Sequence, residues 1–245
     1  MEILGIDVGG TGIKGAIVDV NTGKLVTERY RVPTPKGAKP EEVAEEVAEL
    51  IKHFNWKGRV GCGFPAIITH GVARSAGNIH KSWIGTNVKE LFEKHTGLEI
   101  KVRNDADAAG LAAVTFGSGK GVEGLVMMIT IGTGIGSGVF YNGVLIPNFE
   151  LGAMPYKKYK RVERYASDAV RKKEKLSYDE WGIRLNKFLN LAVFLFSPDL
   201  IILGGGASKN FEKFKHRIDV GIPVIPSQFE NEAGIVGAAL LAKDL

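Results

Sequence analysis

The feature that most constrains the fold is a four-residue sequence that occurs twice. Gly10-Thr11-Gly12-Ile13 and Gly132-Thr133-Gly134-Ile135 are identical, and they lie 122 residues apart. Each copy follows an apolar run typical of a buried strand and precedes a second apolar run, so both are predicted to join the strands of a hairpin. Two copies of a strand–glycine loop–strand unit predict a duplicated, two-lobed architecture.

The first copy also matches the G-x-G-x-x-G pattern of dinucleotide-binding folds, from Gly10 to Gly15. In those folds the glycines open a helix. Here residues 16–20 and 25–32 follow, and both runs are predicted to be strands. The helix that a dinucleotide-binding pattern requires after its glycines is therefore missing, which excludes a dehydrogenase. A Walker A phosphate loop is excluded too, because no Gly-Lys-Ser/Thr stands at the required spacing. A glycine turn without a ligand remains the alternative.

The rest of the chain reads as an α/β sequence. Helices are predicted at 41–54, 106–116, 181–196 and 232–243, and strands at 2–8, 59–64, 99–103, 124–131 and 199–203. Residues 65–87 are rich in Gly, Asn, Ser and Thr, and they form a stretch too long for a plain connector. We therefore expect a functional loop there.

Composition excludes several classes of protein. The chain has 245 residues, enough for one large domain or two lobes, and a single cysteine, Cys62, in an apolar run. A disulfide or a cysteine zinc site is therefore excluded, and Cys62 is expected to be a small buried side chain. No apolar run is long enough to span a bilayer, and the N-terminus lacks the pattern of a secretory signal. We expect a cytoplasmic protein without a membrane partner.

Five motifs in order resemble those of one superfamily. They are Asp7 to Gly15, Lys81 to Asn87, Asn104 to Gly110, Gly132 to Gly136 and Asn231 to Ala239. The chain resembles the actin-like ATPase and sugar kinase superfamily over essentially its whole length, and within it the ROK sugar kinases, more closely the polyphosphate glucokinases. The resemblance implies an α/β fold of the two-lobed actin-like ATPase (ribonuclease H-like) type. It also implies an N-terminal lobe of residues 1–107, with the C-terminal helix 232–245 packing back on it, and a C-terminal lobe of residues 108–231.

The resemblance assigns phosphate-donor binding to the glycine loops, because glycine lets backbone N–H groups approach phosphate oxygens. The implied donor-binding residues are Asp7, Gly9, Gly10, Thr11, Lys14, Gly132, Thr133, Gly134, Gly204 and Gly205. Asp7 resembles the carboxylate that holds Mg²⁺ through water, although an Asp at a strand end also caps turns. Gly204-Gly205-Gly206 matches the place where these kinases receive adenosine, and it is also compatible with a plain turn.

The resemblance also implies an acceptor site. Asp105 resembles the general base that takes the proton of the acceptor hydroxyl, although an Asp at the start of a helix is also an N-cap. Asn104 and Glu150 resemble sugar-binding residues. Asn78 resembles another sugar contact, and a turn role is equally compatible. Asp107 is assigned only to the start of the helix.

Together these motifs imply a phosphotransferase that moves a phosphoryl group from polyphosphate or ATP to a hexose hydroxyl, most simply the 6-hydroxyl of glucose. The implied cofactor is Mg²⁺, without zinc, and the implied assembly is a homodimer. A kinase for a different sugar or polyol and a non-catalytic sugar- or nucleotide-binding protein remain alternatives. A sugar-sensing repressor is disfavoured, because such relatives carry a DNA-binding domain ahead of the kinase-like body and the first predicted strand here begins at Glu2.

Two further features bear on the substrates. Residues 157–175 concentrate Lys and Arg, which predicts either a solvated helix face or a lane for a polyanion such as polyphosphate. Nucleic acid is not expected, because no helix-turn-helix or aromatic-studded groove accompanies the charge. In addition, Ala153 and Pro155 stand where the resembling glucokinases have a His and a Glu that contact the sugar. We therefore expect glucose to bind weakly, or a different acceptor to be used.

Overall fold

The computed structural model of the chain describes residues 1–77, 79–229 and 232–245. The chain folds into two compact units, one made of Met1–Ala112 with Glu232–Leu245 and the other of Ala113–Asn231. The boundary between them falls within helix α3 (Asp105–Phe116), as does the boundary expected after residue 107. We call these the first and the second unit.

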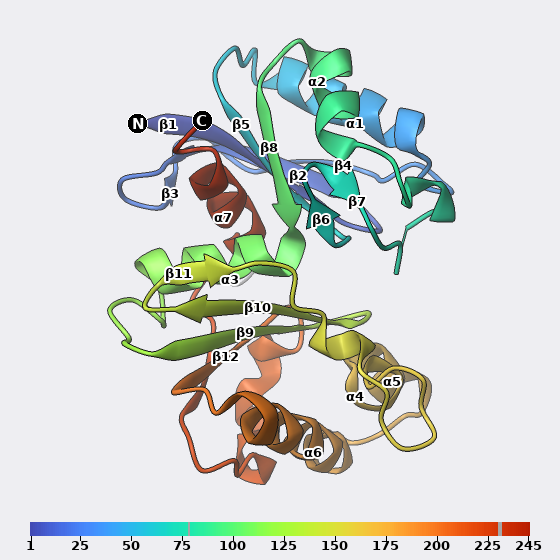
Figure 1. Cartoon of the computed structure of the whole chain (residues 1–245), viewed down its shortest axis with the longest axis vertical. Helices are drawn as coiled ribbons and strands as arrows, with labels where there is room; N and C mark the ends of the chain where they lie inside the picture. The colour runs from blue at the N-terminus through green and yellow to red at the C-terminus, as the bar shows by residue number, and fades with distance from the viewer. Residues whose placement is uncertain (78, 230–231) are drawn as a thin grey trace. The chain divides into compact units, whose positions relative to one another are not determined.

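A six-stranded sheet forms the centre of the first unit (Figure 1). Its strands are β1 (Glu2–Val8), β2 (Ile13–Asp19), β3 (Lys24–Leu25), β4 (Tyr30–Val32), β5 (Val60–Phe64) and β8 (Ile100–Asn104). The order is β3-β2-β1-β5-β8, and β4 also pairs with β2. β1 and β2 are antiparallel, whereas β1, β5 and β8 are parallel. The carboxyl ends of β1, β5 and β8 therefore meet at one edge of the sheet.

The continuous strand predicted at residues 25–32 is wrong, because the structure splits it into β3 and β4. The break lies where Thr27 approaches β2. The hydroxyl of Thr27 accepts a hydrogen bond from the backbone N–H of Ile17 at 3.1 Å. A side-chain oxygen thus takes the donor that a strand carbonyl would otherwise bind, and the ladder is interrupted.

Two glycines on neighbouring strands show which helices cover each face of this sheet. A Cβ on Gly5 would lie 2.0 Å from the carbonyl oxygen of Ile235, in α7 (Ala233–Leu241), whereas a Cβ on Gly15 would meet Leu50, in α1 (Pro40–His53). Gly15 is opposite Ile6 in the antiparallel register, so the two glycines face opposite ways. α7 therefore covers one face and α1, next to α2 (Val88–Thr96), covers the other.

The segment expected to be a long functional loop has structure of its own. It contains β6 (Ile68–Thr69), β7 (Val72–Ala73) and the short 3-10 helix η1 (Lys81–Trp83). Trp83 is fully buried among the core residues of the first unit, and its indole N–H donates to the carbonyl of Ala38 at 2.8 Å. Part of this segment is therefore core structure.

The second unit repeats the sheet of the first. Its strands are β9 (Leu125–Ile131), β10 (Ile135–Tyr141), β11 (Val144–Ile146), β12 (Leu200–Gly204) and β13 (Val224–Pro226), in the order β11-β10-β9-β12-β13. β9 is antiparallel to β10 and parallel to β12, as β1 is to β2 and β5. The duplication predicted from the repeated glycine sequence is thus confirmed in the order and direction of the strands.

Helices of the second unit complete its core. They are α4 (Glu163–Ala166), α5 (Asp168–Lys173) and α6 (Tyr178–Phe196), with the 3-10 helices η2 (Leu151–Ala153), η3 (Ser208–Lys213) and η4 (Lys215–Arg217). Trp181, Leu185 and Phe188 of α6 are buried in the same apolar core as Met127 and Ile129 of β9. Within the residues that the structure describes, none of the helices combines the length and apolarity needed to cross a bilayer.

Candidate functional site: two glycine loops and a carboxylate edge

The first glycine loop, Gly9 to Gly12, joins β1 to β2. The N–H of Gly9 donates to the carbonyl of Gly12 at 3.0 Å, which closes a tight turn and leaves Gly10 and Thr11 exposed. Two side chains from outside the hairpin hold this loop. Arg31 donates to the carbonyl of Thr11 at 2.6 Å, and the hydroxyl of Thr34 donates to that of Gly9 at 2.5 Å. Both contacts were missed by sequence reasoning, since nothing in the local pattern links these positions to the loop.

Asp7 and Lys14 face each other at the base of this loop. They are register partners across β1 and β2, and Lys14 Nζ lies 3.4 Å from Asp7 Oδ2, with both side chains mostly buried. Helix α7 approaches the same carboxylate, because a Cβ on Gly234 would lie 2.9 to 3.1 Å from its atoms. The glycine at position 234 thus leaves open a space beside Asp7 that any larger residue would fill.

Asn104, the last residue of β8, and Asp105, the first of α3, lie at the same edge of the sheet as Asp7. β5 separates β1 from β8, and strand spacing puts the ends of these strands about 10 Å apart. Asn104 is buried, and its side-chain oxygen accepts hydrogen bonds from the N–H groups of Ala106 and Asp107 at 2.8 and 3.2 Å. Asn104 is therefore the N-cap of α3. Asp107, assigned only to the helix start, is in its first turn and fully buried.

The second glycine loop, Gly132 to Gly134, joins β9 to β10. The N–H of Gly132 donates to the carbonyl of Gly134 at 3.0 Å, so this loop is one residue shorter than the first. Gly205 lies against its base. Gly205 has a φ of 74°, and a Cβ there would lie 2.6 Å from the carbonyl oxygen of Ile131. The structure thus brings together Gly132 to Gly134 and Gly204-Gly205, as one glycine-lined edge of the second unit.

Glu150 lies beside the start of β10. The residues on both sides of it bond to Ser137, whose hydroxyl donates to the carbonyl of Phe149 and accepts from the N–H of Leu151. Burial raises the pKa of the Glu150 carboxyl, Arg161 partly offsets this rise, and Glu163 adds to it. A half-buried carboxylate with a cation near it is suited to accept hydrogen bonds from hydroxyl groups.

Three other predictions from the sequence concern Asn78, Cys62 and Ala153. Asn78 lies outside the described residues. Cys62 is fully buried in β5, as expected, and burial raises the pKa of its thiol. Ala153 is the last residue of η2, next to Met154, whose carbonyl accepts the N–H of Val162 at 2.7 Å.

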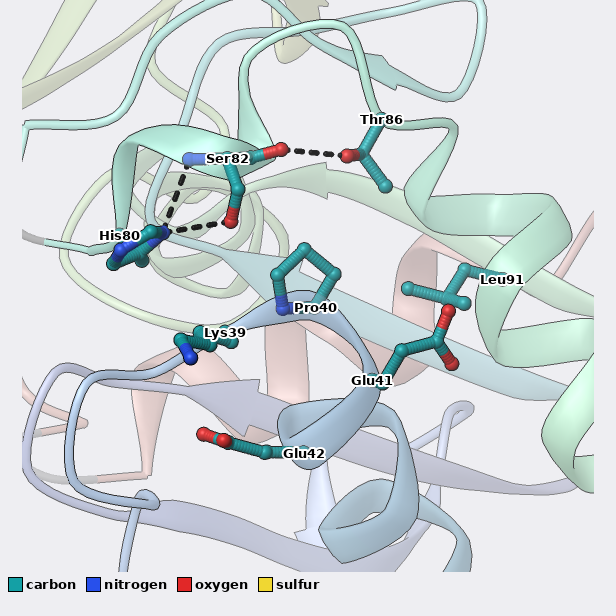
Figure 2. Close-up of a pocket in the computed structure, with 8 residues that line it drawn as sticks. All are labelled: Lys39, Pro40, Glu41, Glu42, His80, Ser82, Thr86 and Leu91. Atoms are coloured by element: carbon teal, nitrogen blue, oxygen red, sulfur yellow. Dashed lines mark hydrogen bonds between the residues drawn. The ribbon is translucent and has the colours of Figure 1, made fainter.

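The first unit also contains a pocket of about 480 Å³ at the start of α1 (Figure 2). Its lining residues are Lys39, Pro40, Glu41, Glu42, His80, Ser82, Thr86 and Leu91. His80 Nδ1 lies 2.7 Å from the hydroxyl of Ser82. Of the predicted site residues that the structure describes, none lines this pocket, so it does not change their assignment.

The Asp7 carboxylate suits a metal ion that takes only one or two protein ligands. Among the described residues, no group of three or more His, Cys, Asp and Glu side chains is placed to hold an ion. Mg²⁺ is commonly held by one or two carboxylates, with water and substrate phosphates completing its shell. Asp7, beside the space that Gly234 leaves, fits that mode of binding.

Comparisons with known proteins agree with this arrangement. Polyphosphate glucokinase from Mycobacterium tuberculosis is 44% identical over 237 residues, which cover 96% of this chain and 89% of that protein. The polyphosphate glucokinase of Mycobacterium leprae is 40% identical over 237 residues, covering 96% of this chain and 73% of that protein.

A solved structure is also similar over nearly its whole length. The crystal structure of inorganic polyphosphate/ATP-glucomannokinase from Arthrobacter sp. strain KM matches with a TM-score of 0.93 and 46% identity, covering 98% of this chain and 97% of that one. This likeness confirms the actin-like ATPase fold that the motifs implied. The model of the ROK family matches residues 3–148, and with the identity to these relatives it shows that this chain belongs to the ROK family.

Proposed function

We propose that this protein transfers a phosphoryl group from polyphosphate or ATP to a hydroxyl of a hexose, with the 6-hydroxyl of glucose as the first acceptor to test. The similarity to two polyphosphate glucokinases and to a polyphosphate/ATP-glucomannokinase supports this reaction. The observation that carries the proposal within this chain is that Asn104 caps α3 at the end of β8. The side-chain oxygen of Asn104 accepts the N–H groups of both Ala106 and Asp107, and Asp105 Oδ1 also accepts that of Ala106 at 2.8 Å, so the cap from Asn104 is kept when Asp105 is changed.

Asp105 is assigned as the general base. As the acceptor oxygen forms its bond to phosphorus, the proton of the hydroxyl passes to the Asp105 carboxylate. The bond between phosphorus and the leaving oxygen breaks, and the shortened polyphosphate or ADP keeps that electron pair. A positioned base of this kind contributes about 10²–10⁴ in rate. Asn104 and Glu150 are assigned to the acceptor.

Donor binding is assigned to the two glycine loops, each within its own unit. Backbone N–H groups of the exposed Gly10 and Thr11, and those of Thr133 and Gly134, would donate to phosphate oxygens, whereas the N–H of Gly132 closes the turn onto the carbonyl of Gly134. Lys14 would add a cation at the first loop, and Gly204-Gly205 would admit a flat base when ATP is the donor. Asp7 would hold Mg²⁺, which offsets the charge on the transferred phosphoryl group.

A different hexose or a polyol is a second candidate acceptor. Ala153 and Pro155 carry no side-chain group that binds a hydroxyl, so two hydrogen-bonding partners expected of a glucose site are absent. An acceptor without the corresponding hydroxyl groups would lose nothing at these positions. A panel of hexoses, polyols and amino sugars, each tested with ATP and with polyphosphate, decides between the candidates.

The direct test of the proposal is Asp105→Asn. The amide has the same shape but does not accept the proton, so kcat is expected to fall by about 10²–10⁴ while the melting temperature and donor binding remain. Asp219→Asn, at an exposed position of the second unit, is the matched control. A variant with near-wild-type kcat would show that Asp105 is not the base. A wild-type protein that phosphorylates no member of the panel would refute the proposed function itself.

Mg²⁺ as the metal, a homodimeric assembly, a cytoplasmic location and the absence of a nucleic-acid partner stay predictions. Titration of activity with Mg²⁺, Mn²⁺ and Zn²⁺ tests the metal, and light scattering tests the assembly.

A further inference from the structure

The positive charge of the chain is concentrated in one stretch of the second unit. Residues 157–175, which we call the basic segment, contain nine Lys and Arg against three Asp and Glu, whereas the whole chain has a net charge of +5. The rest of the chain is therefore close to neutral. A field of this kind attracts anions only where the cations are free of acidic neighbours.

The structure separates these cations into two sets. Three of them are held by acidic side chains of the segment: Arg161 by Glu163, and Arg171 and Lys172 by Asp168. The third acid, Glu174, pairs with Arg184 of α6. Within the described residues, the other six have no acidic partner within 4.0 Å, and all six are exposed: Lys157, Lys158, Lys160, Arg164, Lys173 and Lys175.

The basic segment is attached to the second glycine loop at two points. The N–H of Ala169, in α5, donates to the carbonyl of Gly132 at 3.1 Å. Glu163, in α4, accepts a hydrogen bond from the N–H of Ile135 at 3.3 Å. These contacts fix α4 and α5 against the loop that is assigned to donor phosphates. The helices that carry Arg164 and Lys173 are therefore attached to a phosphate-binding loop. The stretch with Lys157, Lys158 and Lys160 directly precedes α4 in the chain.

A tight turn presents two of the lysines. Tyr156 and Tyr159 pair through two backbone hydrogen bonds of 2.9 Å, so Lys157 and Lys158 form a two-residue tip, and Lys157 has a φ of 52°. Their ammonium groups lie 5.6 and 5.7 Å from the centroids of the Tyr156 and Tyr159 rings. Both rings pack against Tyr165 of α4, at centroid distances of 5.0 and 5.4 Å. The packed tyrosine rings thus hold in place the turn that exposes Lys157 and Lys158.

The packing of the three tyrosine rings indicates which class of anion the basic segment can bind. Single-stranded nucleic acids bind by stacking their bases on free aromatic faces. Here the tyrosines contact one another, and lysines lie over two of the rings, so the segment offers cations without an open stacking surface. A linear polyanion without bases, made of phosphates alone, fits this surface best.

We propose that Lys157, Lys158, Lys160 and Arg164 bind the part of an inorganic polyphosphate chain that extends beyond the second glycine loop. The proposal deepens the proposed function, on which it rests for the identity of the donor. Long chains would reach both the loop and these cations, whereas ATP and tripolyphosphate would reach the loop alone. Affinity for polyphosphate should therefore rise with chain length and fall with salt.

The test uses the full-length protein without sugar, and it measures the dissociation constants of long-chain sodium polyphosphate and of tripolyphosphate across a series of salt concentrations. The triple variant Lys157→Ala, Lys158→Ala and Lys160→Ala is compared with Lys24→Ala, Lys57→Ala and Lys94→Ala, which removes the same charge at exposed positions of the first unit. Circular dichroism checks that both variants are folded.

For the basic-segment variant we expect the Kd of long-chain polyphosphate to rise roughly tenfold or more at low salt. The slope of its logarithm against that of the salt concentration should fall by about 0.7 for each lysine lost. Binding of tripolyphosphate should change little. Equal losses in both triple variants, or equal losses for long and short chains, would overturn the proposal. So would a single-stranded RNA homopolymer that binds as tightly and depends as much on these lysines, because the surface would then be a general polyanion site.

The outcome is separable from that of the proposed function. If the wild type binds polyphosphate through these lysines but phosphorylates no hexose, the binding surface stands and the proposed reaction falls. If it phosphorylates a hexose with ATP and the lysines have no effect on polyphosphate binding, the reverse holds.

Discussion

Gly237 lies at a close contact between two helices that position the site of the first unit. A Cβ at this position in α7 would lie 1.6 Å from the carbonyl oxygen of Ala108 in α3, whereas real Cβ contacts almost never fall below 3.0 Å. In Gly237→Ala the two helices must therefore separate by more than about 1 Å, in an interior packed too densely to absorb the shift.

The cost of that separation can be set against the gain in helix propensity. Overpacking a core costs about 1–3 kcal/mol, and the obstacle here is a backbone carbonyl, so the upper end applies. Replacing a helical glycine by alanine returns about 1 kcal/mol. The net loss is about 2 kcal/mol, which for a chain of this size lowers the melting temperature by about 4–8 °C.

The same substitution is expected to reduce activity. α3 begins at Asp105, and a misplacement of about 1 Å in a catalytic group can cost roughly 10²-fold in rate. The assay is a thermal melt together with kcat for hexose phosphorylation. Gly182→Ala in α6 is the matched control, because its Cβ would meet only side-chain carbons, those of Arg217 at 3.0 Å and Phe214 at 3.3 Å. A Gly237→Ala protein with unchanged melting temperature and kcat would refute the reasoning.

Three other variants test the second unit. Burial raises the pKa of Glu150 above its value of about 4.5 in the unfolded chain. In the wild type, the stabilisation that comes from the protonated carboxyl is therefore complete below about pH 4.5, and it is lost as the pH rises through the folded pKa. Glu150→Gln should therefore melt above the wild type at neutral pH, with a gap that closes in acid, and should bind the acceptor more weakly; a lower neutral melting temperature would contradict this. Gly205→Ala forces a side chain into a left-handed conformation, at a cost of about 1–3 kcal/mol, and against the backbone of Ile131, so the KM for ATP should rise; an unchanged KM would count against a nucleotide role. Ala153→His combined with Pro155→Glu should lower the KM for glucose by about ten- to a few-hundred-fold, and a wild-type KM already in the micromolar range would show that other groups make these contacts.

The central hairpins could be predicted from the sequence because their signals are local. An apolar run, a glycine turn and a second apolar run specify a hairpin without reference to the rest of the chain. Helix α1 was equally clear, since the apolar residues of 41–54 recur on one face, and it is found at Pro40–His53. Helix α2 was missed although its signals are present. The side chain of Asn87 accepts the N–H of Glu90 as an N-cap, and Gly97 ends the helix in a left-handed conformation.

Other parts of the site depend on contacts that no local pattern records. Arg31 reaches the first glycine loop from β4, twenty residues along the chain, and Gly234 meets Asp7 from α7, at the other end of the sequence. The roles of Arg31 and Gly234 can be recognised only when the folded sheet brings them next to the first glycine loop and to Asp7. The roles implied by the resemblance for the donor and acceptor residues stay predictions, because the geometry is compatible with them without testing them.

The two glycine loops show where the halves of a duplicated fold become different. Both contain Gly-Thr-Gly followed by Ile at the start of the next strand. The first loop is held by side chains from β4 and from the connection after it, whereas the second is held by α4 and α5. α4 and α5 have four and six residues, too short for a helical period to emerge from a window of 11–18 residues, so the sequence revealed their charge and not their structure. These short helices carry Arg164 and Lys173 of the free cations, and they also tie the basic segment to one loop. Since the first unit has no counterpart of this segment among its described elements, any preference for a long anionic donor over ATP is expected to arise in the second unit, in residues 157–175 rather than in the repeated loops.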